Sequence, residues 1–213
     1  MSGRKRIVAV DGPAASGKTT LARRLAAHFD LDFLDTGLLY RAVAAKLLEA
    51  GVPLSDTASA VAAARAIAAV DLNPATLRSD TIGQGASIVA ADPEVRRALL
   101  GFQRRFGQGG PGAVLAGRDI GTVVRPDASH RIFVTARLEE RARRRCKELQ
   151  AAGVPIIYDD VLATLQERDA RDRSRAVAPL APASDAFVID TTEQDIDTAF
   201  EVARAYVAGR ARR

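Results

Sequence analysis

The residues with the clearest chemistry lie near the start of the chain, in the stretch 11-DGPAASGKTTLARRL-25. Positions 12–19 match the pattern G-x-x-x-x-G-K-[ST] at every fixed position. The two glycines let the backbone turn successive N–H groups toward an anion, and the helix that follows adds the positive end of its dipole. Lys18 can reach the β- and γ-phosphates of a nucleotide, and the Thr19 hydroxyl suits Mg²⁺. The stretch therefore predicts a triphosphate-binding loop.

Binding a triphosphate is common to molecular switches and to kinases. A guanine-nucleotide switch would normally carry an Asn-Lys-x-Asp motif that reads the base, but the only asparagine, Asn73, is followed by Pro74. A kinase needs a second site that holds the phosphoryl acceptor. The kinase class is therefore the leading hypothesis, and it predicts a second anion site further along the chain.

Two candidate parts of that acceptor site follow expected strands. In 35-DTGLLYRA-42, Thr36 and Arg41 could hold phosphate oxygens. In 117-GRDIGTVVRPDA-128, Arg118 and Asp119 come at the carboxyl end of a strand, where α/β sheets bind ligands. A purely structural Arg–Asp pair is the alternative for the second stretch.

A third candidate is a charged helix near residue 170. The spacing of Arg168, Arg171, Asp172 and Arg175 places all four on one helical face. Such a run of charges is more often a solvated surface whose members pair with one another. The phosphate-binding loop elsewhere in the chain favours the functional interpretation here.

The elements that must position these residues alternate along the chain. Short apolar runs predict five strands, at 7–10, 33–34, 113–116, 132–135 and 187–190. Between them we expect helices at 18–28, 37–50, 55–70 (capped by Ser55), 92–106 (capped by Asp92), 138–152, 159–172 and 195–208. The turn-rich stretch 71–87 interrupts the alternation. The pattern predicts an α/β fold with a doubly wound parallel sheet, in a single domain.

Composition narrows the class of protein. The chain has 213 residues, a net charge of +5, 47% hydrophobic and 27% charged residues, as is typical of a globular domain. No apolar run approaches the ~20 residues that span a bilayer. The single cysteine, Cys146, leaves no disulfide or cysteine-based metal site, and the cytoplasm is the default location. The arginines alternate with carboxylates and lack interleaved aromatic residues, which argues against nucleic acid as a partner.

Six motifs in order strengthen the kinase hypothesis: GPAASGKTT, LDTGLLYRA, ASIVAADPEVRRAL, AGRDIGTVVRPDA, RDARDRSRAVAPLAPASDA and VIDTT. Together they resemble the bacterial cytidylate kinases, which are P-loop nucleoside monophosphate kinases. The resemblance runs from about residue 6 to the end of the chain. It implies transfer of the γ-phosphoryl group of ATP to CMP or dCMP, with Mg²⁺ as cofactor, by a monomer.

The resemblance also implies a role for each site residue. Ser87, Arg96 and Asp119 would read the cytosine, a chemically matched set because a carboxylate can face the exocyclic amine while a hydroxyl and a guanidinium face the acceptor atoms. The monophosphate would be surrounded by Thr36, Arg41, Arg118 and Arg175. The ribose hydroxyls would face Arg168 and Asp172.

The remaining implied roles concern the donor nucleotide and the transfer step. The loop residues that would hold ATP are Gly12, Pro13, Ala14, Ala15, Ser16, Gly17, Lys18, Thr19 and Thr20, with Thr19 also binding the metal. The residues that would act in catalysis are Lys18, Arg118, Asp119, Arg168 and Arg175. Asp35 or Asp11 could help hold metal-bound water, and the sequence does not decide between them.

The chain departs from the family pattern in two places. Relatives often carry a longer, β-rich insertion after the alanine-rich helix, whereas only about 71–85 occupies that position here, so we expect a reduced monophosphate-binding insertion. We expect the core at 1–70, 86–152 and 176–213, and a lid at about 153–175. Arg125 stands where the family usually has an aromatic residue, which we interpret as a surface change.

Two other functions stay open at this point. The chain could be another small P-loop kinase, for a different monophosphate or a small hydroxylated metabolite. It could also be a nucleotide-binding regulatory or nucleic-acid-associated protein without turnover, which the missing Asn-Lys-x-Asp motif and the acceptor-site residues disfavour. The sequence leaves open the preference among CMP, dCMP and UMP.

Overall fold

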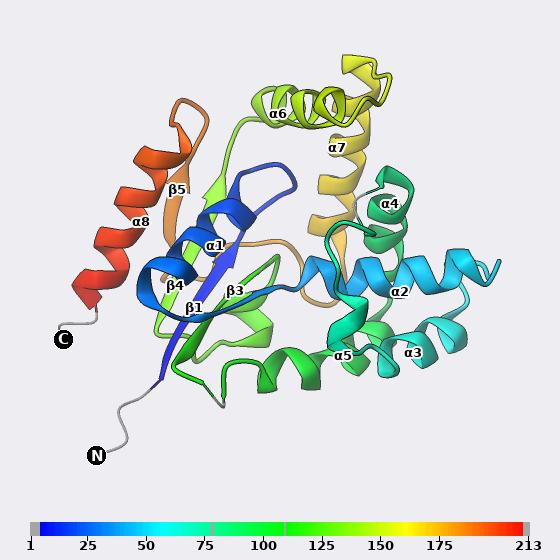
Figure 1. Ribbon diagram of the computed structural model, residues 1–213, viewed down its shortest axis with the longest axis horizontal. Helices are drawn as coiled ribbons and strands as arrows, with labels where there is room; N and C mark the ends of the chain where they lie inside the picture. The colour runs from blue at the N-terminus through cyan, green and yellow to red at the C-terminus, as the bar shows by residue number, and fades with distance from the viewer. Residues whose placement is uncertain (1–4, 78, 109, 211–213) are drawn as a thin grey trace. The chain divides into compact units, whose positions relative to one another are not determined.

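The computed structural model describes residues 5–77, 79–108 and 110–210, without the side chain of Arg210. The chain divides into two compact units (Figure 1). Unit 1 comprises the chain up to Leu34 and from Gly107 onward, and unit 2 comprises Asp35–Phe106. The predicted single domain, with its core, insertion and lid, stays a prediction. The insertion at 71–85 lies within the larger unit 2, and the outermost residues of the predicted core lie outside the described residues.

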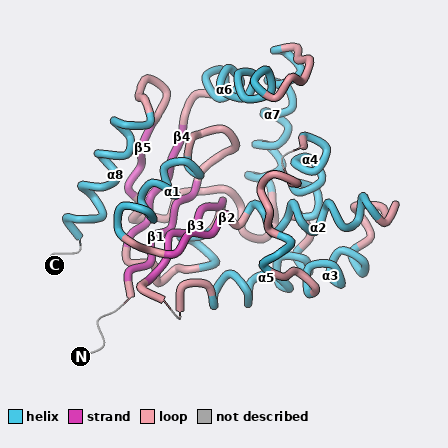
Figure 2. Tube along the Cα trace, viewed as in Figure 1, coloured by secondary structure: helices cyan, strands magenta, loops and turns pink. Residues whose placement is uncertain are grey.

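Unit 1 is built on a five-stranded sheet (Figure 2). The strands are β1 Arg6–Asp11, β2 Asp32–Asp35, β3 Gly112–Gly117, β4 His130–Thr135 and β5 Phe187–Asp190. Their order is β2-β3-β1-β4-β5, and β1 pairs in parallel with both β3 and β4. All five predicted strands, and the parallel α/β fold, are confirmed.

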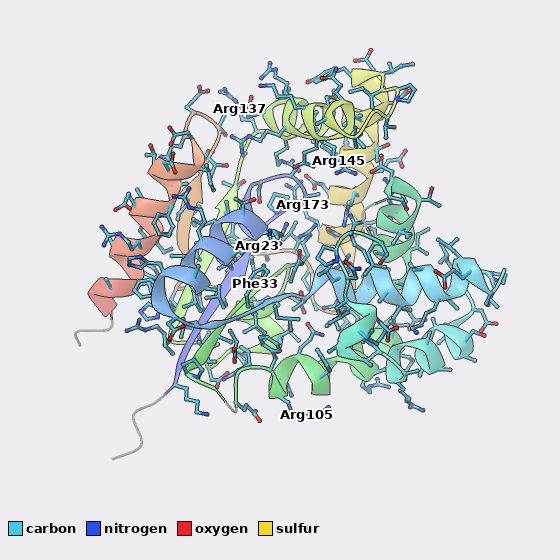
Figure 3. The ribbon with its side chains drawn as sticks, viewed as in Figure 1. Arg23, Phe33, Arg105, Arg137, Arg145 and Arg173 are labelled. Carbon is cyan, nitrogen blue, oxygen red and sulfur yellow. The ribbon has the colours of Figure 1, made fainter. Side chains whose placement is uncertain are left out.

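The apolar residues of the strands explain why the sheet forms. On one face of β1, Val8 and Val10 pack in a core with helices α1 Lys18–Phe29 and α8 Ile196–Arg210. On the other face Ile7 and Ala9 are also buried. Burial on both faces is the mark of a parallel sheet. At the edge strand, Arg23 of α1 lies over the ring of Phe33 at 5.4 Å (Figure 3).

Two further helices of unit 1 pack against each other, α6 Leu138–Ala151 and α7 Tyr158–Ser174 (Figure 1). Cys146 and Leu149 of α6 share an apolar cluster with Val161 and Leu165 of α7. The free thiol is thus a small core residue. In the described part of the chain, no helix is both long and apolar enough to cross a bilayer.

Unit 2 is helical. Its elements are α2 Gly37–Glu49, α3 Thr57–Arg65, the 3₁₀ turn η1 Ala69–Asp71, α4 Asp80–Val89 and α5 Pro93–Arg105. Asp92 caps α5 as predicted, since its carboxylate accepts from the N–H of Glu94 at 2.8 Å. The predicted cap of α3 is wrong by one residue, because Asp56 accepts from the N–H of Ser59. That helix also ends earlier than predicted.

Helix α4 is the largest difference from the sequence prediction, which treated 71–87 as turn-rich. Gly83 and Gly85 lower the intrinsic helix propensity of this stretch. They are needed because α4 packs closely on α2: a Cβ on Gly83 would lie 2.9 Å from Arg41 Nη2, and one on Gly85 would lie 3.1 Å from the Cβ of Ala44. Tertiary packing therefore overrides local propensity.

The carboxyl end of β1 is tied to the segment that follows β3. Both oxygens of Asp11 accept backbone N–H groups, from Ile120 and Gly121, each at 2.8 Å. These two residues begin the π-helical turn η2, Ile120–Val124. Asp11 is 5% exposed, and its burial raises the pKa of the carboxyl from the usual 3.8 to about 7, against the opposing effect of the two N–H groups.

Asp11 should therefore make folding pH-dependent. Between about pH 4 and pH 7 the native carboxyl holds a proton that the unfolded carboxyl has lost, so its contribution to stability falls as the pH rises through this window. In Asp11→Asn this group no longer titrates. The free energy of unfolding of Asp11→Asn, relative to wild type, should rise by up to ~1.4 kcal/mol for each pH unit in the window and level off above it.

Urea unfolding at pH 5, 6, 7 and 8 measures this difference. The matched control is the same series on Asp159→Asn, which removes a carboxyl from the exposed start of α7. A slope for Asp11→Asn no larger than that of the control would contradict the raised pKa.

Candidate active site

The phosphate loop joins β1 to α1 and lies close to β4. Gly12 has a φ of 154°, and a Cβ on it would lie 2.1 Å from the carbonyl oxygen of Val134. Only glycine allows this approach. Gly17, with a φ of 86°, occupies the N-cap position of α1. The backbone geometry thus requires glycine at position 12 and favours it at position 17.

One nearby donor and two donors from distant elements hold carbonyl oxygens of this loop. These bonds run from Lys18 Nζ to Pro13 O at 2.9 Å, from Arg141 Nη1 to Ala14 O at 3.2 Å, and from Thr191 Oγ1 to Ser16 O at 3.1 Å. Because other groups hold three of its carbonyl oxygens, the loop is fixed in place, and its N–H groups are the part that would bind an anion.

A buried hydroxyl in the loop supports the same interpretation. Ser16 is fully buried, and its Oγ has no hydrogen-bond partner among the described residues. A buried polar atom of this kind calls for a partner such as a ligand or water. Lys18 is only 7% exposed and begins the helix. The donor set fits the phosphates of a nucleotide.

A second group of charged residues in unit 1 lies around Asp172 of α7. Arg118, just after β3, donates from Nε to Asp172 Oδ2 at 2.8 Å, and Arg175 donates from Nη2 to Oδ1. Burial alone would raise the pKa of Asp172, but the charges of Arg118 and Arg175 outweigh it and hold the pKa below the usual 3.8. The structure thus joins three of the predicted residues in one cluster.

The other predicted residues of unit 1 are close to this cluster in the chain. Arg168 is half-buried on α7 and is a further positive charge acting on Asp172. Asp119 is 5% exposed at the start of η2, and its carbonyl oxygen accepts from Val123 and Val124. A π-helical turn of this kind often marks a functional site.

Unit 2 holds the remaining four predicted residues. Thr36 is buried at the N-cap of α2, and Arg41 of the same helix donates to the carbonyl oxygen of Leu77 at 2.6 Å. Ser87 of α4 is 2% exposed, and its Oγ has no hydrogen-bond partner among the described residues. Arg96 of α5 is 7% exposed and lies over the ring of Tyr40 at 5.5 Å. Ser87 and Arg96 are therefore not ordinary surface residues.

The sequence did not identify the residues whose side chains donate to the carbonyl oxygens of the loop. Arg141 and Thr191 reach loop carbonyls that are 127 and 175 residues away in the chain, and Asp169 pairs with Arg141 across 28 residues. No local spacing links residues so far apart. The only signal was that Thr191 lies in the motif VIDTT.

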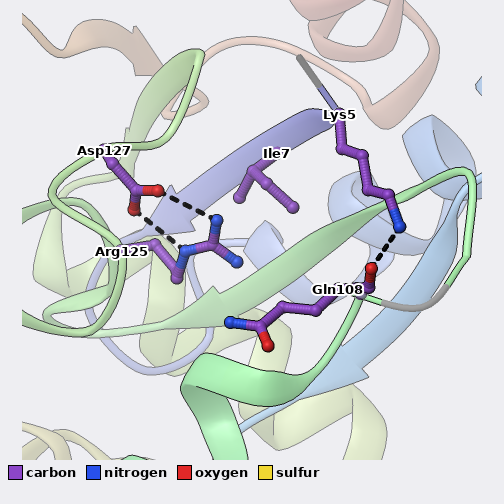
Figure 4. Close-up of a pocket in the computed structure, with 6 residues that line it drawn as sticks. Lys5, Ile7, Gln108, Arg125 and Asp127 are labelled. Atoms are coloured by element: carbon purple, nitrogen blue, oxygen red, sulfur yellow. Dashed lines mark hydrogen bonds and ion pairs between the residues drawn. The ribbon is translucent and has the colours of Figure 1, made fainter. Parts of the chain in front are cut away.

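A small hollow of about 160 Å³ lies at the amino ends of β1, β3 and β4 (Figure 4). The phosphate loop follows the carboxyl end of β1, so the hollow is at the opposite end of the strands. There Arg125 makes two hydrogen bonds with Asp127, and its Nη1 is turned away from them. The Arg125 side chain is only 12% exposed, so the interpretation of this position as a surface change is wrong. Since its charge is balanced by Asp127, we assign the hollow no part in the site.

The predicted Mg²⁺ site can be compared with the oxygen-bearing side chains that the structure describes. Within the described ranges, no group of three or more His, Cys, Asp or Glu side chains could hold a metal ion. Thr19 lies in the first turn of α1 and is half-buried. Mg²⁺ is usually held by one or two protein oxygens together with substrate phosphates and water, and this arrangement fits a site that offers a hydroxyl beside a phosphate loop.

Comparison with known proteins gives a consistent result. A family model described as cytidylate kinase matches residues 8–208. Similar curated proteins are named cytidylate kinase: one from Paramagnetospirillum magneticum is 56% identical, with 96% of this chain and 98% of the relative covered. One from Methylocella silvestris is 57% identical (94% and 93% covered), and one from Rhodospirillum rubrum is 51% identical (97% and 99% covered).

Solved structures agree on the fold. A protein from Eubacterium ventriosum matches with a TM-score of 0.57 and 15% identity, covering 96% of this chain and 99% of its own. A sugar kinase from Janibacter sp. matches with a TM-score of 0.51 and 18% identity, over 96% and 95% of the two chains. At such identities the likeness concerns the fold alone. The family follows from the sequence matches, which extend over nearly the whole chain: this protein belongs to the cytidylate kinase family.

Proposed function

We propose that this protein transfers the γ-phosphoryl group of ATP to CMP or dCMP, giving CDP or dCDP. The observation that carries the proposal is the similarity to proteins named cytidylate kinase, at 51–57% identity over nearly the full chain. In this proposal, Lys18 of the phosphate loop and the Arg118–Asp172–Arg175 cluster would supply the positive charge that such a transfer needs.

On the donor side, loop residues Gly12 to Thr20 would bind the phosphates of ATP through backbone N–H groups. The buried Ser16 hydroxyl would gain the partner that it lacks, and Lys18 would offset charge on the β- and γ-phosphates. Mg²⁺, held by Thr19 and the phosphates, would supply further charge neutralisation.

On the acceptor side, Arg118, Arg175, Thr36 and Arg41 would surround the monophosphate. Guanidinium groups suit this role because their N–H groups match the oxygens of a phosphate. Arg168 and Asp172 would face the ribose. The cytosine would be read by Ser87, Arg96 and Asp119.

The attacking oxygen belongs to the monophosphate and is already anionic, so the transfer needs no strong general base. Catalysis then depends on alignment and on offsetting the charge that spreads over the transferred group. Lys18, Arg118, Arg168 and Arg175 would supply that positive charge, and Asp119 would fix the acceptor. The predicted lid at 153–175 would exclude water, which otherwise hydrolyses ATP.

We further propose that the protein acts as a cytoplasmic monomer, without nucleic acid or a membrane as partner. The arginines support the part of this proposal that concerns nucleic acid and membranes, because many pair with carboxylates of the same chain, as Arg131 does with Asp185 and Arg144 with Glu140. Paired arginines leave less charge available for a polyanion.

The substrate assignment predicts which monophosphates support turnover. Purified protein with Mg-ATP should form ADP rapidly with CMP and dCMP and more slowly with UMP and AMP, because only cytosine matches the set of base-reading groups. Excess EDTA should abolish the reaction. Chromatographic separation of ADP from ATP measures each rate without a second Mg²⁺-dependent enzyme. If CMP gives no more ADP than ATP alone, the proposed function is wrong, and a preference for another monophosphate would favour a different P-loop kinase.

Ser87 of α4 and Ser79, the N-cap residue of that helix, give a matched pair of variants. Ser87→Ala should raise KM for CMP by about 2- to 10-fold, because one hydrogen bond to the base is lost, with KM for ATP unchanged. Its stability should be nearly that of wild type, because the Ser87 hydroxyl has no partner among the described residues to lose. Ser79 instead caps α4 through the N–H of Ile82. Ser79→Ala should therefore lower stability by about 1 kcal/mol and leave KM for CMP unchanged.

Steady-state kinetics and urea unfolding of both variants test this pair. Unchanged KM for CMP in Ser87→Ala would remove Ser87 from the base-reading set, whatever its effect on stability.

The sugar contact of Asp172 can be separated from its ion pairs. Wild type should prefer CMP to 2′,3′-dideoxy-CMP, and Asp172→Ala should lose most of that preference because the acceptor for the ribose hydroxyls is gone. KM for ATP should change little. If Asp172 acts only by holding Arg118 and Arg175, the variant will lose activity equally with both acceptors, which would contradict the ribose contact.

A further inference from the structure

Arg141 of α6 lies behind the phosphate loop and is only 3% exposed. Its guanidinium donates to three separate parts of unit 1: from Nε to Ala136 O at 3.0 Å, from Nη1 to Ala14 O at 3.2 Å, and to the carboxylate of Asp169 on α7. The last contact is bidentate, with Nη2 at 2.6 Å from Asp169 Oδ2. One side chain thus joins the residue that follows β4, the phosphate loop and α7.

In the loop, Arg141 contacts Ala14, a residue that is held in more than one way. Ala14 precedes Ala15, whose φ of 57° lies in the left-handed region that non-glycine residues seldom adopt. Ala14 is also buried in the apolar cluster that contains Ala142 of α6 and Leu165 of α7. A hydrogen bond and apolar packing therefore fix the same loop residue against both helices.

The α7 end of the connection leads to the proposed acceptor residues. Asp169 is 4% exposed, and besides Arg141 it has the exposed Arg173, labelled in Figure 3, at 3.9 Å. It adjoins Arg168 and lies three residues before Asp172, about one helical turn. Asp172 holds Arg118 and Arg175. A displacement of this turn of α7 would therefore move the acceptor cluster.

We propose that Arg141 is a positioning residue that couples the donor site to the acceptor site. It touches neither nucleotide; it fixes the phosphate loop to the turn of α7 that carries the acceptor residues. Occupation of the loop by ATP then stabilises the arrangement that binds CMP, and by thermodynamic reciprocity CMP does the same for ATP. The inference rests on the proposed function, since it needs both nucleotides to bind.

The alternative is a purely structural brace. A buried ion pair often adds little net stability, yet loss of one partner leaves a buried charge that is strongly unfavourable. Any change at Arg141 can therefore lower stability, and thermal unfolding alone cannot separate the two roles. The Kd of CMP without an ATP analogue, divided by the Kd with the analogue, can separate the two roles. A residue that only stabilises the fold changes both constants by the same factor and leaves this ratio unchanged.

The experiment measures the Kd of CMP by calorimetry with and without a saturating non-hydrolysable ATP analogue and Mg²⁺. In wild type the analogue should tighten CMP binding by about 5-fold or more, the lower end of typical coupling. Arg141→Lys keeps the charge but loses the bidentate contact and the fork of donors, so the ratio should fall to within about 2-fold of one. Asp169→Asn, which keeps the side-chain shape, should reduce the ratio in the same way.

Arg143→Lys is the matched control, because Arg143 lies on the same helix, is 61% exposed and pairs only with Glu140 in the described contacts. Its ratio should equal that of wild type. A wild-type ratio near one, or an unchanged ratio in both Arg141→Lys and Asp169→Asn, would overturn the inference. If wild type phosphorylates CMP normally in either case, the proposed function stands, whereas a wild type without CMP turnover refutes the function itself.

Discussion

The phosphate loop can offer its N–H groups to an anion only if its carbonyl groups find partners elsewhere. The carbonyl groups of such a loop have no hydrogen-bond partners within a helix or a sheet. Burying a carbonyl without a partner lowers the stability of the fold. Lys18, Arg141 and Thr191 supply the donors, and they come from α1, α6 and the segment after β5. Much of unit 1 is therefore arranged around a few backbone oxygens of the loop. The close approach of Gly12 to Val134 completes that arrangement.

The parts of the fold that could be predicted are those with a local cause. The strands follow from short apolar runs, since a parallel sheet buries both faces of each strand. The cap of α5 follows from Asp92 and Pro93, whose side chains act within one turn. The phosphate loop follows from fixed positions within eight residues. In each case the interacting groups are neighbours in sequence, so the local sequence pattern is enough to predict the interaction.

The parts that could not be predicted depend on distant partners. The glycines of α4 look like turn residues until α2 is seen to lie against them. Arg141 looks like one of several arginines on α6, and only the fold shows that it is buried while Arg143 is exposed. The pairing of Arg118 with Asp172 joins residues 54 apart in the chain. The resemblance to a family supplied candidate roles for Arg118 and Asp172, but not the contact between them.

The acceptor cluster also explains how a strongly basic site can exist before substrate arrives. Two partly buried guanidinium groups, those of Arg118 and Arg175, would repel each other in a poorly solvated setting. Asp172 lies between them and offsets one of the two charges. One positive charge then remains on the cluster, with that of Arg168 nearby. A monophosphate dianion bound as proposed would balance this remainder, so the carboxylate keeps the arginines in place without neutralising the site that they form.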